Sequence, residues 1–357
     1  MAKRSEGLLK RMTEAHGVPG FEGEVREVFR GELEGAGDFA TDRNGSIMCD
    51  LGGEGPRVLL AAHMDEVGFR VQAVTEPGFL KLVPVGGWWP HVVLGQQVEV
   101  LTAGGMRVTG VVGSKPPHFL SDEERKKVVP LDKMFVDIGA GSRAEVEEWG
   151  VRIGDPVAPR TSFEEMARKG RFVAKAFDNR AGMAAVVEAG RRLARIKRGN
   201  RALLAGTVQE EVGLRGAQTL AALAEPDAAV VLEGTPADDT PGFSEGLAQG
   251  ALGEGVQIRL HDPSAVMSPA LVRLAVETAE KEGIRHQLAV RKGGGTDAGR
   301  LQLAGRGVPC VVLGVPARYI HSHNSVMDLA DYEAMVALSV ALLRRLDGDA
   351  VRKLAEF

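Results

Sequence analysis

The chain has 357 residues, of which 44% are hydrophobic and 26% are charged, the composition of an ordinary globular protein. Its 44 basic and 48 acidic residues give a formal net charge of −4. Because it also lacks a long basic run, the chain does not fit a nucleic-acid-binding protein. Its length exceeds one ordinary core and predicts two domains, or one large domain with an insertion.

The sequence shows neither targeting nor membrane-spanning patterns. The N-terminal stretch MAKRSEGLLKRMTEAHG is charged throughout and lacks the apolar segment of a signal peptide. Nowhere do 18 apolar residues run together, so we expect no membrane partner. The two cysteines, Cys49 and Cys310, provide no disulfide framework and suit a reducing compartment. We therefore expect a cytoplasmic protein.

The first third of the chain changes character near residue 70. Residues 5–35 predict an amphipathic helical region that is interrupted at GVPG. Residues 57–69, RVLLAAHMDEVGF, form an apolar run typical of a buried parallel strand. Between 70 and 162, short alternating segments such as 96–101 and 106–112 are separated by Gly and Pro, which indicates a small β-rich domain.

Helix and strand patterns alternate in the remainder of the chain. Helical spacing of apolar residues occurs at 179–198, 216–225, 268–283 and 331–346, and buried-strand patterns occur at 201–211, 227–234 and 308–316. The fold class predicted is α/β, with a mixed, mostly parallel sheet flanked by helices and interrupted by the β-rich insert.

Ionisable residues gather where these predicted strands end. In open α/β sheets the carboxyl ends of strands carry the functional groups. Seven residues fall at such ends or at the start of the long helix: His63, Asp65, Asp178, Glu210, Glu211, Glu233 and His321. Taken one by one they have ordinary explanations, such as a helix N-cap for Asp178 or a solvated turn for the adjacent glutamates. Their convergence on one sheet edge favours a functional site.

Histidine and carboxylate side chains are ligands for zinc and, less selectively, for cobalt or manganese. Two histidines with four or five carboxylates exceed one tetrahedral zinc site, and they suit two ions about 3.5–4 Å apart that share a carboxylate and activate a water. One of Glu210 and Glu211 would then bind metal while the other accepts a proton. Asp65, two residues after His63 on a strand, can orient its imidazole.

Several long segments carry a resemblance to a known family. They include AAHMDEVGF (61–69), AKAFDNRAG (174–182), TVQEEVGLRGA (207–217), GGGTDAGRLQLAGRGVPC (293–310) and RYIHSHNSVMDL (318–329). With these motifs the chain resembles the TET-type metallo-aminopeptidases of the glutamyl aminopeptidase family, which are large self-compartmentalised exopeptidases. The resemblance runs nearly end to end. It implies hydrolysis of N-terminal residues from peptides that have a free N-terminus.

The resemblance also implies roles for individual residues. His63, Asp178 and Glu233 would hold one divalent ion, and Asp178, Glu211 and His321 would hold the second, with Asp178 bridging. Glu210 would be the general base, and Asp65 would orient His63. The family usually has Asp at the position of Glu233. The two ions per subunit would be zinc or cobalt, or else manganese.

The resemblance has further implications for the domain architecture, and other residues have expected roles outside catalysis. The resemblance implies a catalytic domain of residues 1–69 and 164–357 and an inserted PDZ-like dimerisation domain of residues 70–163, with assembly into a tetrahedral homododecamer. Trp88, Trp89 and His118 in the insert are expected to pack or to form interfaces. His323 and Asp297 are expected to be supporting residues. GGGTDAG lacks the Lys-Ser/Thr of a phosphate loop, so we expect its backbone to lie near substrate.

Three other functions compete with this one. A metal-dependent carboxypeptidase or deacylase could use a similar sheet and similar ligands. A glycosidase also uses paired carboxylates, but it requires them about 5–9.5 Å apart and leaves the histidines unexplained. A non-catalytic scaffold would be expected to have lost ligands, and here none is lost outright.

Overall fold

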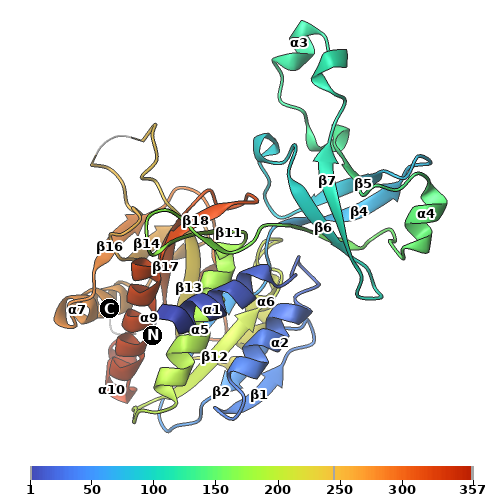
Figure 1. Cartoon of the computed structure of the whole chain (residues 1–357). Coiled ribbons are helices and arrows are strands. Elements are labelled where there is room, and N and C mark those ends of the chain that lie inside the picture. Colours follow the sequence, from blue (N-terminus) through green and yellow to red (C-terminus); the bar gives the residue numbers. More distant parts are fainter. Residues whose placement is uncertain (1, 244–245, 355–357) are drawn as a thin grey trace.

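The computed structural model describes residues 2–243 and 246–354. Within these residues a 12-stranded mixed sheet is flanked by helices, and a closed six-stranded barrel stands beside it (Figure 1). The sheet with its helices and the barrel each have their own hydrophobic core. The predicted fold class, a mixed α/β sheet with a β-rich insert, is confirmed.

Parallel strands form the centre of the sheet. In spatial order they are β12 (Arg201–Thr207), β3 (Arg57–His63), β13 (Ala228–Pro236) and β17 (Cys310–Arg318). Nearly every residue of these strands is buried, as expected for parallel strands covered on both faces. The register places Thr207 beside His63. The carboxyl ends of the central strands therefore meet at one edge.

Antiparallel strands extend the sheet on both sides. One edge is formed by β1 (Asp38–Thr41) and β2 (Ile47–Asp50), and the other by β18 (Ser325–Asp328), β11 (Arg171–Ala174) and β10 (Glu164–Glu165). A branch leaves β17 through β14 (Val256–Asp262), which also pairs with β15 (Ala265–Val266) and β16 (His286–Val290). These outer strands were not predicted from the sequence.

Helices cover the sheet. On one face α5 (Phe177–Leu193) contacts all four central strands and is joined by α1 (Ala2–Glu14), α2 (Gly23–Glu32) and α9 (Leu329–Arg345) (Figure 1). The other helices of this part are α6 (Arg215–Ala224), α7 (Pro269–Lys281), α8 (Ala298–Leu301) and α10 (Gly348–Lys353). The predicted break at GVPG separates α1 from α2. None of the described helices has both the length and the apolar character needed to cross a membrane.

The barrel lies beyond the carboxyl edge of the sheet (Figure 1). Its strands are β4 (Gly68–Val74), β5 (Leu80–Val85), β6 (Gln97–Leu101), β7 (Arg107–Gly113), β8 (Phe135–Asp137) and β9 (Pro156–Pro159). Buried and exposed residues alternate along β7, so one side of the strand fills the barrel interior. Short helical segments connect the strands: η1 (Pro90–Val92), η2 (Pro117–Phe119), α3 (Asp122–Arg125), η3 (Leu131–Lys133) and α4 (Arg143–Glu148).

Two predicted strands were too long. The run 57–69 ends as a strand at His63, and the barrel begins at Gly68. The run 201–211 ends at Thr207. In both cases the apolar pattern continues into a buried connection, because Met64 and Val208 are buried although they lie outside the strands. Both connections carry residues of the candidate site.

Candidate active site

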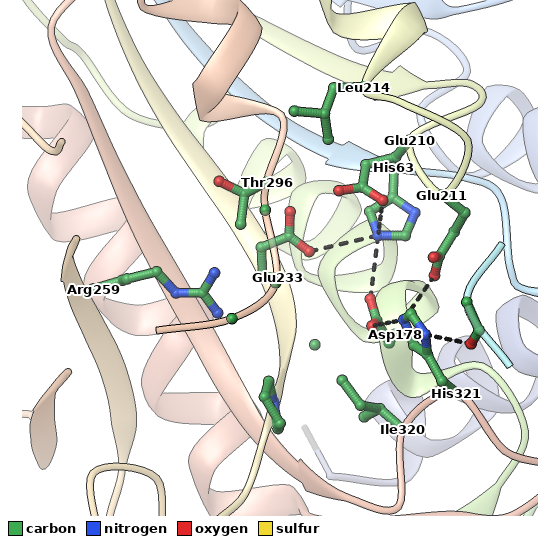
Figure 2. A pocket seen from close by; sticks show the side chains of 16 residues that line it. His63, Asp178, Glu210, Glu211, Leu214, Glu233, Arg259, Thr296, Ile320 and His321 are labelled. Carbon is green, nitrogen blue, oxygen red and sulfur yellow. Dashed lines mark hydrogen bonds and ion pairs between the residues drawn. The ribbon is translucent and has the colours of Figure 1, made fainter. Parts of the chain in front are cut away.

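The five candidate metal ligands and the candidate general base, six residues in all, meet at the carboxyl edge of the central strands. They line a cavity of about 540 Å³ (Figure 2). His63 ends β3, Glu233 lies in β13, and the other four come from the segments after β12 and β17 and from the first turn of α5: Glu210, Glu211, His321 and Asp178. Side chains far apart in the sequence thus form one cluster.

Asp178 lies between the two histidines. Its Oδ1 is 3.2 Å from Nε2 of His63, and its Oδ2 is 3.4 Å from Nε2 of His321. Two further carboxylates complete the arrangement. Glu233 Oε2 lies 3.5 Å from the same nitrogen of His63, and Glu211 Oε1 lies 3.3 Å from that of His321. The cluster therefore consists of two groups that share one carboxylate.

The backbone around Asp178 explains its position. Within α5 the dihedral angles of Asp178 and Asn179 are not helical, and the N-cap residue Ala176 makes no side-chain capping bond. Asn179 donates a hydrogen bond to the carbonyl of Leu232 in β13. A Cβ at Gly234 would lie 2.6 Å from the carbonyl oxygen of Phe177. Asp178 is thus held over the sheet by close backbone packing, and it does not cap the helix.

Asp65 supports the two adjacent glutamates. Its carboxylate oxygens accept the backbone N–H groups of Glu210 and Glu211, each at 3.0 Å. Nδ1 of His63 lies 3.1 Å from the main-chain carbonyl of Asp65 and 3.6 Å from its carboxylate. The contact of Asp65 with His63 is therefore closest through the main chain, while the side chain orders the glutamate pair. The sequence pattern did not reveal this second role.

The cluster carries an excess of buried negative charge. Burial, together with the nearby Glu211 and Glu233, holds the pKa of Glu210 well above its usual range. Burial and then Asp178 raise the pKa of Glu233 to about 7. Burial alone would lower the pKa of His321, but Asp178 and Glu211 outweigh it and raise the pKa to about 11. These three pKa shifts indicate that the carboxylates lack sufficient positive charge nearby.

The residues of the cluster fit divalent cations. Ligand atoms of His63, Asp178 and Glu211 lie within 4.8 Å of one another, as do those of His63, Glu210 and Glu233. Within the described residues, Oε1 of Glu233 is buried without a hydrogen-bond partner. This oxygen and nitrogen donor set is one that zinc, cobalt and manganese accept.

Protein cations do not supply the missing charge. Among the described residues that line the cavity, Arg259 is the one arginine or lysine, and it pairs with Asp262 at 3.3 Å. Arg259 and Thr296 were not singled out from the sequence, since no motif marks them. Gly293, Gly294 and Gly295 line the same cavity, and a place for this glycine-rich segment near substrate stays a prediction.

The residues predicted to have supporting roles lie around the cluster. Asp297 accepts a hydrogen bond from the hydroxyl of Thr207, and it is buried. His323 is buried, and burial followed by Lys175 lowers its pKa to about 4. Its ring lies 5.4 Å from that of Trp88. Both residues are buried, and a supporting role for them stays a prediction.

The other two residues of the insert that were expected to pack or to form interfaces, Trp89 and His118, are more exposed than Trp88. Trp88 stacks on Phe69 with ring centroids 4.7 Å apart, so it packs as predicted. Trp89 is 63% exposed and His118 is exposed, which leaves a role at an interface as a prediction for both.

The fold and the site together define a metal-dependent peptide hydrolase. A family model described as M42 glutamyl aminopeptidase matches residues 45–338. Glutamyl aminopeptidase from Lactococcus lactis subsp. cremoris is 33% identical over 359 residues, which cover 98% of each chain. The chain therefore belongs to the M42 glutamyl aminopeptidase family, and it is a metal-dependent aminopeptidase.

Solved structures agree with this assignment. A TET aminopeptidase from a marine-sediment archaeon of the Thaumarchaeota superimposes with a TM-score of 0.96, at 40% identity over 99% of each chain. The TET1 peptidase of Pyrococcus horikoshii, described as assembling into a tetrahedron or a large octahedral shell, superimposes with a TM-score of 0.86. It is 34% identical and covers 96% of this chain and 100% of its own.

Proposed function

We propose that this aminopeptidase works through a dinuclear metal centre in which Asp178 is the bridging ligand. The observation that carries the proposal is that the two oxygens of Asp178 face the imidazoles of two different histidines, His63 and His321. A carboxylate shared in this way is the arrangement that two ions about 3.5–4 Å apart require.

The other ligands follow from the two groups around Asp178. On one side His63 and Glu233 would complete the first site, and on the other Glu211 and His321 would complete the second. Glu233 replaces the aspartate expected at its position, and its longer side chain reaches to 3.5 Å from Nε2 of His63. The extra methylene therefore permits coordination.

Glu210 is assigned as the general base. When bound, the two ions would lower the pKa of a water and polarise the scissile carbonyl. Glu210 lines the cavity, and its backbone is fixed by Asp65. From there its carboxylate accepts the proton of the attacking water and then delivers it to the leaving amine. Glu211, one residue on, faces His321 and serves as a ligand.

Selectivity for N-terminal residues would come from the substrate's free α-amino group. This group would be held by one of the ions or by the carboxylates of the cavity wall, which are Asp178, Glu210, Glu211 and Glu233. A peptide with a blocked N-terminus lacks the free amino group and should be a poor substrate.

Chelation and substrate choice test this function together. Treatment with EDTA should abolish release of aminoacyl chromogenic groups, and zinc, cobalt or manganese added separately should restore it to different extents. A glycosidase would be unaffected by EDTA. Faster cleavage of N-blocked than of free-amino peptides would instead assign the site to a deacylase or carboxypeptidase and would contradict the proposal.

Assembly through the barrel domain is the second part of the proposal. Large apolar side chains are exposed on the barrel and its connections, among them Trp89, Phe119 and Ile153. Exposed apolar residues on a protein surface can form interfaces, and most of the barrel projects away from the sheet and its helices (Figure 1). We therefore propose a tetrahedral dodecamer built from dimers through residues 70–163, which sedimentation velocity would test.

The cytoplasm is the proposed compartment. Cys49 and Cys310 are free and buried, which agrees with a reducing environment. Fractionation of the source cells would test the location.

A further inference from the structure

His321 is the least buried of the proposed ligands. Its side chain is 36% exposed, whereas those of Asp178 and Glu211 are 11% and 6% exposed. It lies in the segment after β17, and its φ of 56° is in the left-handed region, which non-glycine residues rarely occupy. Packing around the ring therefore holds His321 less firmly than the other ligands, so its orientation must depend on specific contacts.

The inserted barrel domain supplies one such contact. Nδ1 of His321 lies 2.8 Å from the main-chain carbonyl oxygen of Gly87, in the loop between β5 and η1. A carbonyl can only accept a hydrogen bond, so Nδ1 carries the hydrogen. In the neutral imidazole that binds a metal, Nε2 is then the nitrogen with the free lone pair, and it is the one that faces Asp178 and Glu211. This is the tautomer that a metal ligand needs.

Trp88 holds this loop in place. Its indole Nε1 donates to the carbonyl of Gly68 at 2.9 Å, and its ring stacks on Phe69. On the other side the same ring lies against His323, two residues after His321. The loop is thus fixed to the start of the barrel and also to the segment that carries the ligand.

The glycine at position 87 permits the close approach. A Cβ on Gly87 would lie 3.3 Å from Nδ1 of His321, so the imidazole would have to move. The φ of Gly87 lies outside the left-handed region, unlike the φ of 83° at Gly86. Alanine at position 87 is therefore compatible with the backbone and affects mainly the contact with the ring.

We propose that Gly87 is a positioning residue through which the barrel domain completes the second ion site of the catalytic domain. This inference rests on the proposed function, because it takes His321 as a ligand. Groups that orient a metal-bound histidine typically change metal affinity by 10–100-fold when they are lost. The second ion should therefore bind about 10–100-fold more weakly when the imidazole of His321 loses its hydrogen bond to the Gly87 carbonyl, while the first ion is retained.

The test compares Gly87→Ala with Gly104→Ala in the full-length protein. Gly104 lies in the turn between β6 and β7 of the same domain, where the nearest atom to an added Cβ is 3.8 Å away. Chelator-stripped protein is titrated with Co²⁺ against a competing chelator, and bound ions, the visible cobalt spectrum, kcat and KM are recorded. We expect wild type and Gly104→Ala to bind two ions, and Gly87→Ala to show a weakened second ion with an altered spectrum.

A second variant guards against misfolding. Trp88→Phe keeps an aromatic ring against Phe69 but loses the hydrogen bond to Gly68, and we expect a smaller weakening of the same ion. If Gly87→Ala folds and binds both ions with wild-type affinity and spectrum, the inference is wrong. If Gly87→Ala does not fold, Trp88→Phe decides: an affinity for the second ion equal to that of wild type overturns the inference. Wild type that binds fewer than two ions would instead contradict the proposed dinuclear function.

Discussion

Oδ2 of Asp178 lies 3.4 Å from Nε2 of His321, and the opposite oxygen of the same carboxylate faces His63. Replacing Asp178 by Asn would leave one oxygen and would turn an amide nitrogen towards one of the histidines. We expect Asp178→Asn to hold at most one ion per subunit and to lose at least about 1,000-fold in kcat. Elemental analysis with chromogenic kinetics checks this, with exposed Asp122→Asn as control. If Asp178→Asn still binds two ions, Asp178 is not the bridging ligand.

The adjacent glutamates provide a matched pair. Glu210→Gln should keep both ions, because Glu210 is assigned to proton transfer, and should lower kcat by several orders of magnitude. Glu211→Gln should lower the affinity for the second ion, because Glu211 faces His321. Metal content and kcat measured side by side separate the two roles. Glu210→Gln activity within tenfold of wild type would exclude this residue as the base.

Asp65 offers a test of how the glutamates are held. Both of its carboxylate oxygens accept backbone N–H groups, and an amide in its place would set one N–H against another. We expect Asp65→Asn to reduce kcat about 10–100-fold and to lower the melting temperature. Wild-type kcat in a variant that binds two ions would show that the order of the Glu210–Glu211 backbone does not limit the reaction.

We expect His16 to make the stability of the fold depend on pH. It is buried at the break between α1 and α2, neither ring nitrogen has a hydrogen-bond partner within the described part of the chain, and burial with Lys175 lowers its pKa to about 3. The unfolded chain takes up this proton near pH 6.5 and the folded chain only near pH 3, so the unfolded state binds more protons in between. The free energy of unfolding should therefore fall by about 1.4 kcal/mol for each pH unit below 6.5.

Melting temperatures at pH 7 and pH 5 test this dependence. His16→Phe removes the proton site and fills similar space, so it should lose less stability on acidification than wild type does. Exposed His261→Gln serves as the control and should follow wild type. An equal fall in melting temperature for His16→Phe and wild type would show that His16 is not responsible.

The site could be predicted from sequence because its residues follow conspicuous apolar strands. His63 and Glu210 come at the ends of runs that are buried on both faces, and parallel strands place such ends at one edge. The strand β14 escaped prediction because its sequence, VQIRLHD, buries polar residues. Gln257 and Arg259 are accommodated there by hydrogen bonds to Gln249 and Asp262, which no local pattern reveals.

The contact between Gly87 and His321 also could not be predicted. It depends on how the barrel sits against the catalytic domain, and neither residue lies in an element whose periodicity fixes its direction. The same holds for Asp65, whose side chain reaches the backbone of residues 210 and 211 across a boundary between segments. Sequence patterns therefore identified which side chains come together at the site, and the structure showed which hydrogen bonds hold them in position.

The central claim is that this chain holds two ions on either side of Asp178. A crystal of the zinc- or cobalt-loaded protein, measured at the absorption edge of the metal, tests it most directly. The account predicts two anomalous peaks about 3.5–4 Å apart, one beside His63 and one beside His321. A single peak, or peaks that do not contact Asp178, would contradict it.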